Sequence, residues 1–386
     1  MTQTALYTGD CIEVLKRLPA ESVQCVVTSP PYYGLRDYGH AGQIGLEQTP
    51  DDYVAKMVEV FREVRRVLRD DGTVWLNIGD SYAGSNKGTM ADGSVVGGPK
   101  QRTNQGTMLG AIPKTAKIEG CKPKDLIGIP WMLAFALRAD GWYLRQDIIW
   151  HKPNPMPESV ADRCTKAHEY VFLLSKSPRY YFDAEAVKES AVGGDEKRNR
   201  RSVWTIPTRP FKEAHFAVMP EALVEPCVLA GTSEKGCCAA CGAPNKRVTG
   251  RPCAQCSALI PTQGKECSAC GHRNTEWQAE RESNPATRAG ESETAGPLVA
   301  RKTDLTPKSI VAGWEPSCAC GAETAPCVVL DPFTGSGTVA VVAERHGRSF
   351  VGAELNPEYA QIAWGRIAGA RIANALNETV DRAVVH

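Results

Sequence analysis

Apolar positions in the first eighty residues follow two patterns that predict alternating strands and helices. Short apolar runs at 5–8, 23–27 and 73–78 have the length and the β-branched or aromatic content of buried strands. Between the last two runs, apolar residues recur at helical spacing from Val54 to Leu68, which predicts an amphipathic helix that Gly72 ends. This part of the chain is therefore expected to form an α/β domain.

The same alternation returns further along the chain. Residues 130–139 predict a helix with proline in its first turn, and residues 143–150 and 169–175 predict two strands. Near the end, the apolar run 328–330 precedes a glycine-rich turn, a helix, a strand and a further helix. We therefore expect an α/β fold with a mostly parallel sheet.

Two stretches without hydrophobic periodicity interrupt this alternation. Residues 83–124 are rich in Gly, Thr, Lys and Pro and hold seven basic against two acidic residues. We expect a mobile basic loop that contacts DNA there, and a solvated insertion is the alternative. Residues 231–327 hold ten of the 15 cysteines and are expected to form an inserted module. It would separate two halves of one domain, 1–225 and 328–386.

The composition excludes several classes of protein. The 386 residues carry a formal net charge of +1, so any nucleic-acid binding has to rely on local positive charge. No apolar run reaches 18 residues, and residues 1–5 lack the basic and apolar regions of a signal peptide. We therefore expect a cytoplasmic protein without membrane contact. In such a reducing compartment, the cysteines favour metal ligation over disulfides.

The first strong motif is the turn Thr28-Ser29-Pro30-Pro31-Tyr32, which directly follows an apolar strand. Two consecutive prolines remove two backbone donors and fix two φ angles, so the turn is stiff and presents carbonyls outward. An amino group on a nucleobase would then donate to Ser29 and to a proline carbonyl while Tyr32 stacks on the ring. An ordinary turn at a strand end is the alternative.

The second motif, Asp-Pro-Phe-Thr-Gly-Ser-Gly-Thr from Asp331 to Thr338, favours the functional interpretation of the first. A strand, a glycine-rich turn and a helix form the entry to a nucleotide pocket, because glycine lets the backbone approach the ligand. About twenty residues after the glycines, Glu354 follows another strand, where an acidic group suits ribose hydroxyls.

These two motifs resemble motif IV and motif I of the amino-group DNA methyltransferases. The catalytic motif precedes the cofactor motif, which is the permuted order of the beta class. The resemblance covers roughly residues 5–80, 125–225 and 327–370. It implies a Rossmann-like methyltransferase fold with circularly permuted motifs, and site-specific DNA methylation of the kind found in restriction–modification systems. Relatives of this class are often dimers, so a homodimer is a further expectation.

The resemblance implies transfer of a methyl group from S-adenosylmethionine to the exocyclic amine of a base flipped out of double-stranded DNA. Ser29 and the carbonyl of Pro30 would accept the N–H groups of that amine, next to Pro31, and Tyr32 would stack on the base. The serine favours cytosine N4, because adenine-N6 enzymes usually have aspartate there. Adenine N6 stays open as the alternative target.

On the cofactor side, the resemblance assigns a set of residues to S-adenosylmethionine. Asp10 would contact the adenine amino group, a role compatible with capping the helix that follows. His215 begins a segment that looks like motif X, which packs on the methionine end. The expected cofactor-binding residues are Asp10, Thr28, His215, Asp331, Phe333, Gly335, Gly337, Thr338 and Glu354.

Recognition of DNA is expected in a short segment, residues 185–214, and in the cysteine-rich insertion. A basic cluster in the short segment is typical of phosphate contact, with a solvated charge run as the alternative. The residues expected to bind DNA are Lys197, Arg198, Arg200 and Arg201. The preceding tract includes His151 and His168, for which a structural role is favoured over a role in orienting the site.

The cysteine spacing predicts two structural zinc sites, because four thiolates bind zinc tetrahedrally. Two Cys-x-x-Cys pairs separated by a short loop predict a compact zinc ribbon, and the outer pairs predict a second site nested around it. Reduced, buried cysteines are the alternative, but the insertion has few large apolar residues to bury them in. The inner ligands are Cys253, Cys256, Cys267 and Cys270, and the outer ligands are Cys238, Cys241, Cys318 and Cys320.

Three alternative functions fit the sequence less well. A zinc-ribbon nucleic-acid-binding protein with an inactive methyltransferase domain is disfavoured, because both motifs are intact. Methylation of a protein amide or of RNA uses similar turns, but the motif order and the basic loops favour DNA. A cysteine nucleophile at Cys227 is disfavoured by its position beside the motif X segment.

Overall fold

The computed structural model describes residues 2–34, 40, 42–83, 120–158, 160–190, 197–209, 218–253, 255–256, 258–261, 267–271 and 310–384. The chain divides into two compact units, Met1–Pro244 with Cys320–His386, and Asn245–Ala319. The predicted basic loop at 83–124 lies almost entirely outside the described residues, so its role stays a prediction.

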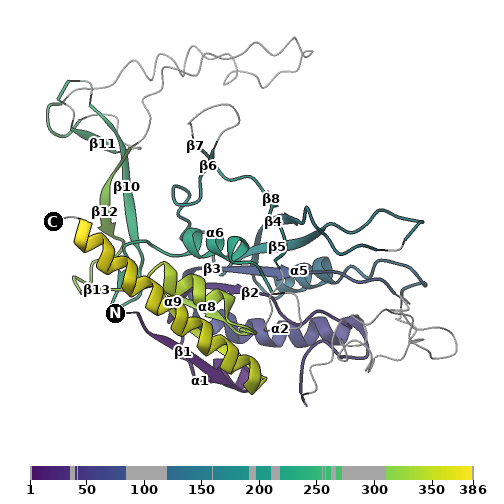
Figure 1. Ribbon diagram of the computed structural model, residues 1–386. Coiled ribbons are helices and arrows are strands. Elements are labelled where there is room, and N and C mark those ends of the chain that lie inside the picture. Colours follow the sequence, from purple (N-terminus) through teal and green to yellow (C-terminus); the bar gives the residue numbers. More distant parts are fainter. Residues whose placement is uncertain are drawn as a thin grey trace, which may run out of the picture. The chain divides into compact units, whose positions relative to one another are not determined.

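The larger unit is built on one eight-stranded sheet. In spatial order its strands are β1 (Thr4–Thr8), β15 (Ser349–Glu354), β14 (Val328–Asp331), β2 (Val23–Thr28), β3 (Leu68–Ile78), β5 (His168–Ser175), β4 (Tyr143–His151) and β8 (Val203–Thr205). Neighbouring strands are parallel, except where β5 pairs with β3 and β4. The prediction of a mostly parallel sheet is confirmed. The last two strands of the chain lie between the first two (Figure 1).

Helices cover both faces of this sheet (Figure 1). One apolar core joins the sheet to α1 (Cys11–Arg17), α2 (Pro50–Val67) and α5 (Ile129–Ala139). The other joins it to α6 (Glu221–Gly231), α8 (Thr338–Arg345) and α9 (Pro357–Val384). The result is the three-layer arrangement that alternating strands and helices favour.

The chain passes directly from α2 into β3, and here the structure differs from the prediction. The helix ends at Val67, and Gly72 lies inside the strand that follows. A Cβ atom at Gly72 would lie 2.5 Å from Leu68 Cδ1 and 3.0 Å from the carbonyl oxygen of Gln24. The prediction that Gly72 ends the helix was wrong, because the glycine serves a close approach between strands instead.

The remaining strands are short or lie in the smaller unit. In the larger unit, β6 (Glu189–Ser190) pairs with β7 (Lys197–Arg198), and β9 (Cys237–Cys238) pairs with β13 (Thr324–Ala325). In the smaller unit, β10 (Asn245–Pro252) lies between β11 (Leu259–Pro261) and β12 (Ile310–Pro316), antiparallel to both. Among the described residues, no helix is long and apolar enough to cross a membrane.

Candidate active site

Two adjacent parallel strands, β2 and β14, carry the two sequence motifs at their carboxyl ends. Thr28, the last residue of β2, donates a 2.6 Å hydrogen bond from Oγ1 to Asp331 Oδ1 at the end of β14. Both side chains are buried, and the same Asp331 oxygen accepts a 3.0 Å hydrogen bond from the backbone N–H of Phe333. Ligands of open α/β sheets bind outside the carboxyl ends of such strands. Motifs 303 residues apart thus form one site.

The glycine-rich turn is held against Glu354, the last residue of β15. The backbone N–H of Gly335 donates to Glu354 Oε2 at 2.7 Å, and that of Asn356 donates to Oε1 at 2.8 Å. Gly337 has a φ of +82°, and a Cβ atom there would lie 2.8 Å from Ala363 Cβ on α9. Glycine at 337 is therefore required both by its left-handed backbone and by the packing of the turn on α9.

Burial raises the pKa of the two carboxyl groups beside this turn, Asp331 and Glu354. For Asp331 burial raises the pKa to about 7, although the hydrogen bonds from Thr28 and from a backbone N–H act in the opposite direction. Burial also raises the pKa of Glu354, again against backbone hydrogen bonds. Two buried carboxyl groups beside one cavity favour a ligand that brings hydrogen-bond donors or positive charge.

The Pro-Pro turn presents Ser29 and Tyr32 to a polar cluster on neighbouring strands. Tyr32 Oη donates a 2.7 Å hydrogen bond to Glu169 Oε2 on β5, and it lies 3.2 Å from Asn77 Oδ1 on β3. Ser29 Oγ lies 3.3 Å from the same Asn77 oxygen and 3.4 Å from Tyr32 Oη. The turn therefore places two hydroxyl groups in a continuous network that ends at a carboxylate.

Packing fixes the turn from two sides. The phenol of Tyr53 donates a 2.9 Å hydrogen bond to the carbonyl of Pro31, so the carbonyl of Pro30 is the better candidate to accept from a ligand. On the other side, a Cβ atom at Gly79 would lie 2.7 Å from Tyr32 Cε2. Glycine at 79 therefore makes room for the tyrosine ring at the end of β3.

Three polar residues of this cluster, Asn77, Lys152 and Glu169, were not predicted from the sequence. Lys152, which directly follows β4, forms an ion pair with Glu169 and lies 4.3 Å from the ring centroid of Trp150. The two charged side chains are only 18% and 16% exposed. The available signal was weak, because it consisted of polar residues on or directly after strands predicted next to the active site.

Three residues that were singled out from the sequence pack within the fold and do not line the cavity. His151 Nδ1 lies 3.1 Å from Thr205 Oγ1, and the ring of His168 packs edge-on against Tyr170. Cys227 is buried in α6, and burial raises the pKa of its thiol well above the usual value. None of the three is among the residues that line the cavity, and the structural role of the histidines stays a prediction.

The two motifs share one cavity of about 330 Å³, a size typical of small-molecule sites. Thr28 and Gly337 are not among its lining residues, and His215 lies outside the described part of the chain. Asp10 lines the cavity and also caps α1 through hydrogen bonds of 2.9 and 3.1 Å. The predicted site residues that line the cavity are Asp10, Ser29, Pro30, Pro31, Tyr32, Asp331, Phe333, Gly335, Thr338 and Glu354.

The predicted phosphate-binding cluster is partly neutralised within the protein. Arg198 and Arg201 both pair with Glu189, at 3.0 and 2.7 Å, and Arg200 lies over a tryptophan ring at 4.6 Å. Lys197 is exposed. Because three of the four cations have partners of their own, their contact with DNA stays a prediction.

The predicted metal ligands within each unit lie close together. In the smaller unit the sulfur atoms of Cys253, Cys256, Cys267 and Cys270 all lie within 4.8 Å of one another, and in the larger unit so do those of Cys238, Cys241 and Cys320. Cys318 belongs to the smaller unit, so its place in the outer group stays a prediction. In the inner group the Sγ–Sγ distances are 3.6 Å for Cys253–Cys270 and 3.5 Å for Cys256–Cys267. A tetrahedron of thiolates around zinc has an edge of about 3.8 Å. The all-sulfur donor set and its spacing therefore fit Zn²⁺.

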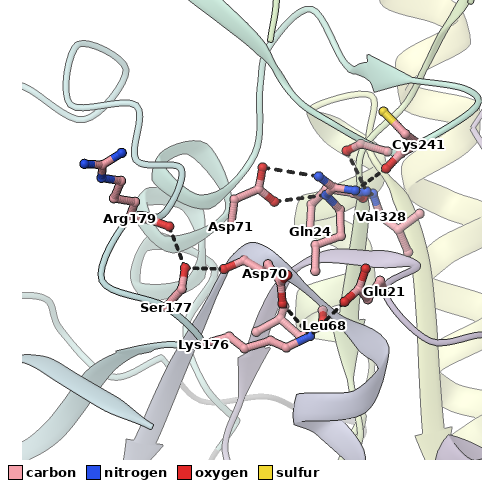
Figure 2. A network of polar contacts seen from close by, with 12 residues as sticks. Glu21, Gln24, Leu68, Asp70, Asp71, Lys176, Ser177, Arg179, Cys241 and Val328 are labelled. Carbon is pink, nitrogen blue, oxygen red and sulfur yellow. Dashed lines mark hydrogen bonds and ion pairs between the residues drawn. The ribbon is translucent and has the colours of Figure 1, made fainter. Parts of the chain in front are cut away.

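Two side chains fasten the turn at Cys241 and Gly242 to the catalytic sheet (Figure 2). Arg69 on β3 donates to the carbonyl of Cys241. Gln24 on β2 donates to the carbonyl of Gly242 at 3.2 Å and accepts from the backbone N–H of Val328 at 2.6 Å. The turn thus lies at the amino ends of β2 and β14, the two strands whose carboxyl ends carry the sequence motifs.

A family model described as DNA methylase matches residues 23–239 and 327–364. Both sequence motifs fall inside the matched ranges. The cysteines from Cys241 to Cys320 fall outside them, so these metal-ligand candidates are not part of the region that the family model describes.

Individual relatives agree with that match. Type II methyltransferase M.Cfr9I of Citrobacter freundii is 40% identical over 364 residues, which cover 94% of this chain and 87% of the relative. Type II methyltransferase M.SmaI of Serratia marcescens is 53% identical over 232 residues, covering 60% and 76%. The solved structure of PvuII DNA methyltransferase (cytosine-N4-specific) is 16% identical, with a TM-score of 0.51 over 95% of this chain and 86% of that chain. At this identity, the likeness to the solved structure shows the fold alone.

Proposed function

This chain belongs to the DNA methylase family, and from that premise we propose that it transfers a methyl group from S-adenosylmethionine to N4 of a cytosine in double-stranded DNA. One observation carries the proposal: the Ser29–Tyr32 turn and the glycine-rich turn after Asp331 line the same cavity. The first turn suits an amino group and the second suits a nucleotide. The reaction needs both within reach of each other.

The proposed role of the Pro-Pro turn is to make a weak nucleophile reactive. The lone pair of an exocyclic amine is conjugated into the base, so the nitrogen attacks poorly. Ser29 Oγ and the carbonyl of Pro30 accept its N–H groups, draw the nitrogen toward a tetrahedral shape and free the lone pair. Preorganised acceptors of this kind stabilise the charge that develops in the transition state. Tyr32 stacks on the base, which has to leave the duplex to reach the cavity.

S-adenosylmethionine supplies an electrophilic methyl group on a positively charged sulfur. The raised pKa values of Asp331 and Glu354 support its binding, since both carboxyl groups gain from a ligand that brings donors or positive charge. Gly335 and Phe333 offer close backbone approach and an apolar wall beside them. Asp10, which also lines the cavity, is proposed to accept from the adenine amino group.

One observation favours cytosine N4 over adenine N6, which is the second candidate. Position 29 is serine, where adenine-N6 enzymes usually have aspartate. The PvuII enzyme, with which this chain shares the fold, is described as cytosine-N4-specific. The motif order along the chain supports the permuted beta class, and a homodimer stays an expectation for sedimentation analysis to test.

The proposed function is tested by incubating the protein with methyl-labelled S-adenosylmethionine and duplex DNA. We expect label in the DNA, and a Ser29→Ala variant should transfer at least about 100-fold more slowly while it still binds DNA. DNA that gains no label from the wild-type protein would refute the proposal.

We also propose that both four-cysteine groups bind zinc, and that the inner group takes part in DNA recognition. The basic recognition segment is short and partly neutralised, which leaves recognition to other parts of the chain. Deletion of residues 253–270 should then change the choice of DNA sequence or the affinity for DNA. Unchanged target preference in that variant would refute the role in recognition.

A further inference from the structure

We propose that Glu169 receives the proton that leaves the methylated amine, and that Tyr32 passes this proton to it from Ser29. The inference rests on the proposed function, because it concerns the same amino group and the same cavity. It assigns a positioning and proton-accepting role to a carboxylate that neither sequence motif contains.

The chemistry requires such an acceptor. Transfer of a methyl group to N4 forms one N–C bond and breaks one C–S bond, whose electron pair returns to sulfur. The nitrogen is left with one surplus proton and a positive charge. Ser29 Oγ, which is proposed to accept an N–H of this nitrogen, is the first atom that the proton reaches. Ser29 itself is too weak a base to keep it, so a second group has to remove it.

A hydrogen-bonded path leads from Ser29 to a carboxylate. Ser29 Oγ lies 3.4 Å from Tyr32 Oη, and Tyr32 Oη donates to Glu169 Oε2 at 2.7 Å. As Ser29 takes the amine proton, its own proton passes to Tyr32 and the phenol proton passes to Glu169. Both hydroxyl groups are then restored, and Glu169 carries the proton.

Asn77 fixes the direction of this path. Its Nδ2 donates to Glu169 Oε2 at 3.2 Å and to the carbonyl of Tyr170 at 3.1 Å. The amide oxygen is thereby turned toward Ser29 and Tyr32. An amide holds the two hydroxyl groups in place but does not take up a proton near neutral pH. Among the described residues, Glu169 is the carboxylate that these hydrogen bonds connect to Ser29.

The surroundings of Tyr32 and Glu169 suit these roles. Burial raises the pKa of Tyr32 well above its usual value, and the charge of Glu169 adds to this, so the phenol stays protonated and donates. The titratable groups that face Glu169 are Tyr32, Lys152 directly after β4, Lys166 before β5, and His168 on β5. Burial lowers the pKa values of Lys166 and His168. Lys152 is the cation that forms an ion pair with the carboxylate.

The test measures single-turnover methyl transfer to duplex DNA at a single pH, about pH 8, with saturating S-adenosylmethionine. Glu169→Gln should lower the rate constant by about 100-fold or more, while DNA affinity and the circular dichroism spectrum stay as in the wild type. Glu169→Asp keeps a proton-accepting carboxylate and should recover part of this loss.

Two further variants separate the proton path from a general effect on the fold. Tyr32→Phe keeps the ring and removes the hydroxyl, so it should slow transfer like Glu169→Gln. Because both act in one path, the double variant should be no slower than the slower single variant. Glu158→Gln makes the same chemical change in a carboxylate that pairs with Arg163 at 2.7 Å outside the cavity, and it should transfer at the wild-type rate.

The outcomes are distinguishable from failure of the proposed function. A rate for Glu169→Gln within about threefold of the wild type, or an equal loss of rate in Glu169→Gln and Glu169→Asp, would overturn the proton path. Transfer by the wild type to adenine would overturn the base assignment alone, and the same rate comparison would still decide the path. A wild-type protein that transfers no methyl group would overturn both.

Discussion

Thr28 and Asp331 stand 303 positions apart in the sequence and share a buried 2.6 Å hydrogen bond. Each ends one of two adjacent parallel strands, and each belongs to one of the two motifs. The bond therefore joins the residues proposed to act on the base to those proposed to hold S-adenosylmethionine. A substitution of Thr28 should therefore affect the binding of S-adenosylmethionine, even though the Thr28 side chain does not line the cavity.

Replacing Thr28 with valine keeps the shape of the side chain and removes the donor to Asp331. The buried carboxyl group then loses a partner, so we expect a loss of about 1–3 kcal/mol in the free energy of unfolding, measured by urea denaturation. Weaker binding of S-adenosylmethionine, measured by calorimetry, should accompany it. Thr28→Ser keeps the hydroxyl group and is the matched control. Equal stability and cofactor affinity in the two variants would show that the hydrogen bond has no such role.

Asp331 should make the stability of the ligand-free protein depend on pH. Its pKa is about 7 in the folded protein, against an ordinary value of 3.8, so the folded state holds the proton more tightly. Stability from this group is then greatest below about pH 4, falls as the pH rises toward about 7, and is constant above that. The full effect is about 4 kcal/mol at most.

The variant Asp331→Asn isolates this contribution. Urea denaturation at pH 5 and pH 8 should give a larger loss of stability between the two values in the wild type than in the variant. An identical difference in both proteins would mean that Asp331 titrates normally.

Gly242 and Gly321 form a natural pair for testing how the outer cysteine group is fastened to the sheet. Both have left-handed backbones, with φ values of +70° and +65°. A Cβ atom at Gly242 would lie 2.9 Å from Gln24 Nε2, whereas one at Gly321 would meet nothing within 4 Å. Gly242→Ala should therefore cost about 1 kcal/mol more than Gly321→Ala in thermal or urea unfolding. Equal losses of stability in the two variants would show that the turn at Gly242 is not tightly packed against the sheet.

Metal removal should affect the two cysteine groups differently. We expect about two zinc ions per chain by atomic emission, and about one after either Cys238→Ser or Cys253→Ser. Because Arg69 and Gln24 tie the Cys241 turn to β3 and β2, loss of the outer ion should lower the unfolding temperature of the catalytic unit more than loss of the inner ion. Protein that is purified without zinc and keeps its full stability in chelator would contradict the metal assignment.

Local chemistry made the two motifs predictable, because each consists of neighbouring residues whose backbone restrictions are known. The turn at Ser29 and the glycines at 335 and 337 carry their conformational meaning in the sequence itself. The mostly parallel sheet followed from the alternation of apolar runs. The prediction at Gly72 was wrong because glycine has two roles that the sequence does not separate. Glycine ends helices and also permits close approach between strands, and only the packed structure distinguishes these roles.

Glu169 could not be found in the same way. It stands 137 positions from Tyr32, and nothing in its neighbourhood along the chain distinguishes it from other strand residues. Its significance comes from the antiparallel pairing of β5 with β3, which brings it beside Asn77 and the tyrosine hydroxyl. The inner cysteine group lies between these extremes, because the spacing predicted its two pairs while the fold had to bring their sulfur atoms together.

The most direct test of the central claim is the identity of the methylated nucleoside. DNA treated with the wild-type protein and S-adenosylmethionine is digested to nucleosides and analysed by chromatography with mass spectrometry, with the Ser29→Ala variant as the control. We predict N4-methylcytosine from the wild type and a strongly reduced amount from the variant. N6-methyladenine, 5-methylcytosine or no methylated nucleoside from the wild-type protein would contradict the account.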